Sequence, residues 1–102
     1  MVKVEFVRSS GKVVSFKIKG HAESLICCAI SAISQTTVIG IEEVLKINVK
    51  YDIRDGFLNL NLEGQTLEDV ERCQILLETM ILGLKSIEIT DGKNIKVETK
   101  EV

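Results

Sequence analysis

The chain has 102 residues, of which 45% are hydrophobic and 27% are charged, and its formal net charge is −2. This length and composition predict one soluble globular domain over residues 1–102 with an ordinary hydrophobic core, and they exclude an intrinsically disordered chain. Proteins that bind a phosphate backbone usually carry a basic surplus, so the charge predicts no direct nucleic-acid partner.

The cysteines and the N-terminal segment predict a protein of the cytoplasm. There are three cysteines, two of them adjacent, and this odd number does not fit the disulfide framework of a small secreted domain. The segment MVKVEFVRSS alternates charged and apolar residues, whereas a signal peptide requires an unbroken apolar core. We therefore expect reduced thiols and no export.

The first twenty residues predict a β-hairpin. Apolar residues alternate with polar ones on both sides of the turn-forming segment RSSGK, from Val2 to Phe6 before it and from Val13 to Ile18 after it. A period of two is typical of strands with one buried face, and the short separation predicts antiparallel pairing.

Residues 24–41 contain no charged side chain and predict the central core helix. Ser24 is the expected N-cap, and the apolar residues that follow it cover nearly the whole helix circumference. A segment of this length also approaches that of a membrane-spanning helix. Its many hydroxyl and amide side chains argue against a membrane partner, because lipid tails leave them unsatisfied whereas a protein interior can satisfy them.

The second half of the chain again predicts a hairpin followed by a helix. The runs INVKYDI and FLNLNLE alternate on either side of the turn segment RDG. Thr66 and Asp69 resemble a capping box that opens an amphipathic helix. The segment DGKN separates the helix end, or a short strand within residues 87–90, from a last strand at 95–97. The expected fold is α+β, a single layered domain in the order ββαββαβ whose mainly antiparallel sheet packs against two helices.

The segment GHAESLICCAIS, residues 20–31, carries the candidate chemistry. If Ser24 is the N-cap, Cys27 lies in the first helical turn, where free backbone N–H groups and the helix dipole favour a thiolate. The only histidine of the chain, His21, follows the second strand and is close enough in sequence to act as the base for Cys27. Ser31 lies one turn beyond Cys27 on the same helix face, where its hydroxyl can orient the pair.

Each of these residues also has an ordinary structural interpretation. A cysteine in an apolar helix is most often a small buried side chain, and we expect this of Cys28 and Cys73. A histidine after a strand is commonly a solvated loop residue, and Ser31 can bond to the carbonyl four residues earlier. One histidine beside two adjacent cysteines lacks the ligand spacing of a zinc site, so no metal or other cofactor is expected. The residues alone leave a cysteine hydrolase and a plain interaction domain open.

The motifs resemble those of the bacterial ribosomal-processing cysteine protease family (Prp-like). GHA at the end of the second strand and CCAISAISQTTVIGIEEVL on the first helix fit the family pattern of GHA, a loop and C-A-x-x-S-x-x-x-Q. The resemblance extends over the ββαββαβ order and covers most of the chain. It implies a homodimeric cytoplasmic endopeptidase that removes a short N-terminal extension from large-subunit ribosomal protein twenty-seven, cutting after an aromatic residue.

The resemblance assigns the general base to His21, the nucleophile to Cys27 and the supporting serine to Ser31. Cys27 rather than Cys28 keeps the family register, because the serine and glutamine then follow it by four and eight residues. The chain departs from many members in its shorter loop between histidine and cysteine, and in a serine where they have an acidic residue. The alternatives are a non-catalytic dimeric module that binds a ribosomal or other protein in the same groove, and a redox sensor at Cys27.

Overall fold

The computed structural model describes the whole chain, residues 1–102, and contains five strands and two long helices. The strands are β1 (Val2–Ser9), β2 (Lys12–Gly20), β3 (Lys50–Arg54), β4 (Phe57–Asn61) and β5 (Ile95–Glu101). The helices are α1 (Ser24–Ile39), which continues into a π-helical turn η1 (Gly40–Val44), and α2 (Leu67–Asp91). The ββαββαβ order and the α+β class predicted from the sequence are confirmed.

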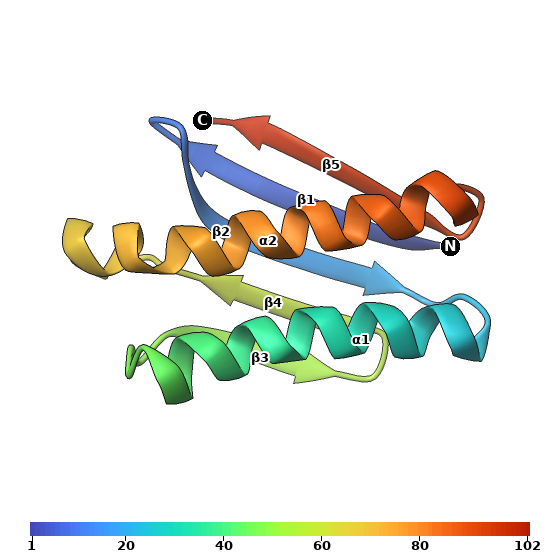
Figure 1. Cartoon of the computed structure of the whole chain (residues 1–102), viewed down its shortest axis with the longest axis horizontal. Helices are drawn as coiled ribbons and strands as arrows, with labels where there is room; N and C mark the ends of the chain where they lie inside the picture. The colour runs from blue at the N-terminus through green and yellow to red at the C-terminus, as the bar shows by residue number, and fades with distance from the viewer.

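The strands form one sheet in the order β3-β4-β2-β1-β5, and both helices lie on the same face of it (Figure 1). Three neighbouring pairs are antiparallel, whereas β5 runs parallel to β1. The parallel pair arises because α2 carries the chain back along the sheet before β5 begins, as a parallel connection requires. The mainly antiparallel sheet is therefore confirmed, with one parallel edge.

Turn chemistry fixes the first hairpin. Ser10 and Gly11 connect β1 to β2 with φ values of 53° and 79°. Positive φ at both central residues is typical of the type I′ turn, whose twist matches that of paired strands. This explains why the segment RSSGK reverses the chain so tightly.

The core lies between the sheet and the two helices. Alternate strand residues face the helices, and the rings of Phe6 and Phe16 meet there with centroids 5.8 Å apart. On the helical side of the core, α1 buries Ile30 and α2 buries Leu77, as expected for helices with one apolar side against a sheet. The opposite face of the sheet carries no helix, so its side chains meet solvent (Figure 1).

The continuous helical segment Ser24–Val44 is the one helix long and apolar enough to cross a membrane by length and composition. A core helix of a folded domain passes the same test. Here Ser34 and Thr37 are buried, and their hydroxyls donate to the carbonyls of Ile30 (2.8 Å) and Ile33 (3.0 Å). The two buried hydroxyls of this helix are thus satisfied inside the protein, while Ser24, Ser31, Gln35 and Thr36 are exposed.

One expectation at a helix end is wrong, and an alternative left open at another is decided in favour of the helix. Helix α1 has Glu23 rather than Ser24 at its N-cap, and no side chain caps it. Residues 87–90 are not a strand, because α2 continues to Asp91. The last turn of α2 packs Ile87 against the core, and the Glu88 carboxylate accepts the backbone N–H of Val97 on β5 at 2.6 Å. The N-cap half of the capping box is confirmed, since the Thr66 hydroxyl accepts a hydrogen bond from the Asp69 N–H at 3.1 Å.

Candidate active site

A cleft of about 130 Å³ lies between the N-terminal half of α1, the end of β2 and the turn that joins β3 to β4. His21, Cys27 and Ser31 all line it, so the structure brings the three sequence-predicted residues together. Two of them come from α1 and one from the segment after β2. The end of β2 and the start of α1 therefore contribute to one cavity.

Cys27 is the fourth residue of α1 and is half-buried. Its Sγ accepts a hydrogen bond from the Ala22 backbone N–H at 3.1 Å and donates one to the Ala22 carbonyl at 3.2 Å. The Cys27 N–H itself donates to the Glu23 carbonyl at 3.0 Å. The N–H groups that helix geometry leaves free are those of the preceding residues, Ser24 to Ile26.

His21 is exposed at the rim of the cleft and follows Gly20, which has a φ of 110°. The Gly20 N–H donates to the Gly56 carbonyl at 3.0 Å, which ties the end of β2 to the β3–β4 turn. The imidazole lies directly against Gly56, since a Cβ added there would overlap His21 Nε2. The left-handed backbone of Gly56 (φ 69°) and its missing side chain thus create the space that His21 occupies.

Ser31 is exposed, one helical turn beyond Cys27, and the Gln35 side chain follows on the same wall of the cleft. No hydrogen bond joins Cys27 to His21 or to Ser31, because both bonds of the sulfur go to Ala22. The three side chains share the cleft without being locked to one another. Catalytic hydrogen bonds often form only in the complex with substrate, so this geometry is compatible with a dyad.

The other two cysteines have different environments. Cys73 is fully buried in the core as expected, and burial raises the pKa of its thiol. The expectation of a buried Cys28 is wrong, because this side chain is exposed. Successive helix residues are rotated by about 100°, so the turn that aims Cys27 at the cleft aims Cys28 at solvent. No group of three or more His, Cys, Asp or Glu side chains is placed to hold a metal ion.

The β3–β4 turn supplies cleft residues that sequence reasoning missed. Arg54, Asp55 and Phe57 line the cleft, and the Arg54 guanidinium carbon lies 4.6 Å from the centroid of the Phe57 ring. The sequence indicated a turn here and nothing more. Its proximity to His21 depends on the pairing of β2 with β4, in which Lys19 faces Phe57, and no local pattern signals that pairing.

Comparisons with known proteins agree with this arrangement. The structure is similar to that of a ribosomal processing protease Prp from S. aureus in complex with a covalently linked product peptide, with a TM-score of 0.86, 24% identity, and coverage of 98% of this chain and 100% of that one. It is also similar to that of SMU.848 from Streptococcus mutans, with a TM-score of 0.84, 22% identity, and coverage of 100% and 96%. These likenesses establish the fold.

The sequence comparisons are more specific. A search of curated proteins gave no significant match. The family described as cysteine protease Prp matches residues 1–96, which is nearly the whole chain and includes every residue of the cleft. The chain belongs to the cysteine protease Prp family.

Proposed function

We propose that this chain is a cysteine endopeptidase in which His21 takes the proton of Cys27. The thiolate then attacks the scissile carbonyl, His21 protonates the leaving amine, and water hydrolyses the acyl-enzyme to restore the thiol. The observation that carries the proposal is the cleft itself, where the fold gathers the only histidine, from the segment after β2, with a half-buried cysteine and Ser31 from α1. Ser31 is proposed to support the pair from the next helical turn.

The start of α1 supports the charges that this reaction creates. The Ala22 N–H already donates to the sulfur, and a hydrogen bond to the charged form stabilises it. The free N–H groups at the helix N-terminus belong to the same first turn as Cys27, and such groups are suited to hold an oxyanion. We assign the oxyanion-binding role to the N–H groups of Ser24 to Ile26. The Cys27 N–H is not assigned this role, because it donates to the Glu23 carbonyl within the helix.

The proposed substrate is the N-terminal extension of large-subunit ribosomal protein twenty-seven, cut after an aromatic residue in the cytoplasm. Similar structures of the S. aureus protein are those of a ribosomal processing protease with a substrate peptide and with a product peptide. The cleft has an apolar wall that suits an aromatic side chain, formed by Ile30, Ile53 and Leu58. Burying an aromatic ring there would supply much of the binding energy.

We also propose that the protein acts as a homodimer joined through its helical layer. Ile75, Leu82 and Ile89 recur every seven residues on the outer side of α2, and their exposed fractions are 79%, 69% and 84%. Beside them, a groove between α1 and α2 is lined by small and apolar residues, including Ile33 and Met80. Such a row on both copies can pack against itself across a two-fold axis.

Cleavage of a synthetic peptide that carries the ribosomal extension tests the proposal. We expect turnover by the wild type, loss of turnover in Cys27→Ala and His21→Ala, and near-normal turnover in the matched control Cys28→Ala. Loss in Cys28→Ala with normal turnover in Cys27→Ala would contradict the assignment. Binding of the peptide without any cleavage by the wild type would instead identify the non-catalytic module.

A further inference from the structure

The face of the sheet opposite the helices has a composition unlike that of the rest of the molecule. Strand alternation places on it every residue next to a core-facing one, such as Lys3 beside Val2 and Val4. Its charged side chains are seven cations and three carboxylates. They are Lys3, Lys17, Lys19, Lys50, Arg54, Lys96 and Lys100, with Glu5, Asp52 and Glu98.

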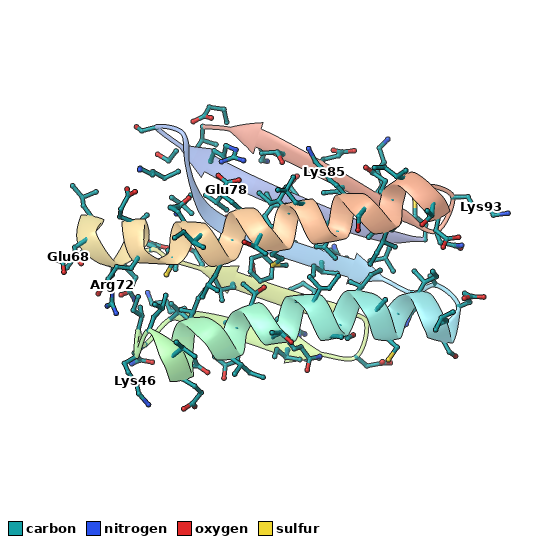
Figure 2. All side chains as sticks on the ribbon, in the orientation of Figure 1. Lys46, Glu68, Arg72, Glu78, Lys85 and Lys93 are labelled. Carbon is teal, nitrogen blue, oxygen red and sulfur yellow. The ribbon has the colours of Figure 1, made fainter.

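This face therefore carries a surplus of four positive charges. Because the whole chain carries −2, the remaining surface carries −6. The helical layer contributes to that balance, with acidic residues such as Glu68 and Glu78 on α2 (Figure 2). The near-neutral total, which predicted no nucleic-acid partner, averages over two faces of opposite sign.

The carboxylates of the sheet face are already paired. Arg54 meets Asp52 at 3.0 Å, Lys96 meets Glu98 at 3.6 Å and Lys100 meets Glu5 at 3.7 Å. The other four cations, all lysines in β1, β2 and β3, have no ion-pair partner in the protein. The surplus is thus available to a ligand.

The cations are also concentrated in one row across the strands. Lys3 on β1 is directly opposite Lys19 on β2 and directly beside Lys96 on β5. The row continues through Phe57 on β4 to Arg54 on β3, and no carboxylate lies in it. Like charges directly opposite each other destabilise a sheet, so folding alone does not favour this arrangement. An anion bound between the lysines would offset their repulsion by attracting both.

We propose that this basic row, defined as Lys96, Lys3, Lys19, Phe57 and Arg54, binds single-stranded RNA. At about 4.8 Å per strand the row is about 19 Å long, enough to follow several nucleotides of a phosphate backbone. Phe57 is half-buried and presents a ring at the same level, and cations combined with an aromatic platform are the usual means of binding single strands. The Arg54 guanidinium already lies over the Phe57 ring, and nucleic-acid bases stack on both guanidinium planes and aromatic rings, whereas an acidic protein would match the charge alone.

The row ends at the candidate active site. Arg54 and Phe57 belong both to it and to the cleft that holds Cys27. RNA bound to the row would place the cleft next to any protein that is bound to the same RNA. The choice of RNA over DNA rests on the proposed ribosomal substrate. The charge pattern and the ring stand independently of any protease activity, so binding is measured without cleavage.

Fluorescence anisotropy of fluorescein-labelled oligouridylate with the full chain tests the proposal. We expect binding that weakens with salt at a logarithmic slope of about −0.7 for each contacting cation. The variant Lys3→Glu/Lys19→Glu should bind at least about tenfold more weakly, since two phosphate contacts are replaced by repulsion. The matched control Lys46→Glu/Lys85→Glu changes the net charge equally, at exposed positions in the helical layer (Figure 2), and should retain most of the affinity.

Three results would overturn the proposal. One is the absence of saturable binding by the wild type at low salt. Another is an equal loss of affinity in both double variants, which would mean that net charge alone matters. The last is that polyglutamate binds as tightly as oligouridylate and that Phe57→Leu changes neither affinity. That result would identify a docking site for acidic proteins. Lys3→Glu/Lys19→Glu places two glutamates opposite each other where the wild type has two lysines, so the melting temperature of the variant is measured beside its affinity, and a folded variant that does not bind supports the proposal.

Discussion

Gly56 fixes the place of the His21 side chain because it has no side chain of its own. A Cβ on Gly56 would overlap the imidazole of His21, and the backbone of Gly56 is left-handed. Sequence reasoning identified His21, Cys27 and Ser31 because they lie close together along the chain. It could not identify Gly56, which reaches them only through the pairing of β2 with β4.

At the residue scale, Gly56→Ala should reduce peptide cleavage by roughly 10- to 100-fold, because displacing a catalytic group by about 1 Å has effects of that size. The control is Gly11→Ala, which imposes the same left-handed strain of about 1–2 kcal/mol in open space far from the cleft. Steady-state kinetics of both variants isolate the contact with His21. Equal activities in the two variants would contradict the positioning role of Gly56.

At the scale of elements, Gln74 joins α2 to β2. Its buried amide accepts the Val13 N–H and donates to the Val13 carbonyl, both at 2.8 Å, beside the irregularity where β1 and β2 shift register. Gln74→Leu leaves two buried backbone groups unpaired, and we expect it to lower the free energy of unfolding by about 2–4 kcal/mol. Urea denaturation measures this. Gln65→Leu, which removes one exposed bond to the Asn48 carbonyl, should cost under about 1 kcal/mol, and equal losses would contradict this account.

The ion pair between Arg8 and Glu78 makes the attachment of α2 to β1 dependent on pH. Its two bonds measure 2.5 and 2.9 Å, and the Arg8 guanidinium holds the pKa of Glu78 below its usual range. A lowered folded-state pKa means that the contribution is complete above the unfolded value of about 4.3 and is lost as pH falls through the folded value. The Glu78 side chain is 44% exposed, so solvent screening limits the effect to under about 1 kcal/mol.

We therefore expect Glu78→Gln to be less stable than the wild type at neutral pH, with a difference that shrinks as the pH falls below about 4.3. Chemical denaturation across this range measures the difference directly. A difference that stays constant from neutral to acid pH would show that the pair contributes through packing rather than charge.

The elements could be predicted more fully than their ends. Periodicity and turn residues are local signals, so both hairpins, the Thr66 cap and the two helices were predictable. The true cap of α1 and the length of α2 depend on tertiary contacts, such as the bond from Val97 to Glu88 that holds the last turn of α2 over β5. Local sequence does not contain those contacts.

At the scale of the whole molecule, the order of strands determines which surfaces exist. The pairing of β1 with β5 joins residues from the two ends of the chain, and it assembles the basic row from lysines that are scattered in the sequence. Net charge could not reveal this, because it contains no information about position. The same limit applies to the apolar row on α2, which the sequence showed only as part of an amphipathic helix.

The proposed dimer is tested at this scale. The wild type should sediment at micromolar concentration with twice the chain mass of 11.3 kDa. Leu82→Glu should sediment as a monomer, because it places a charge in the apolar row, whereas the exposed neighbour Lys85→Glu should remain a dimer. A monomeric wild type would contradict the proposed assembly.

The rate of cysteine alkylation as a function of pH, read for each thiol by peptide mass in the wild type and in His21→Ala, tests whether His21 activates Cys27. We expect Cys27 to react faster at neutral pH than its exposed neighbour Cys28, buried Cys73 to react slowest, and His21→Ala to slow Cys27 alone. If Cys27 reacts no faster than Cys28 and does not respond to the loss of His21, the two residues are not a catalytic pair.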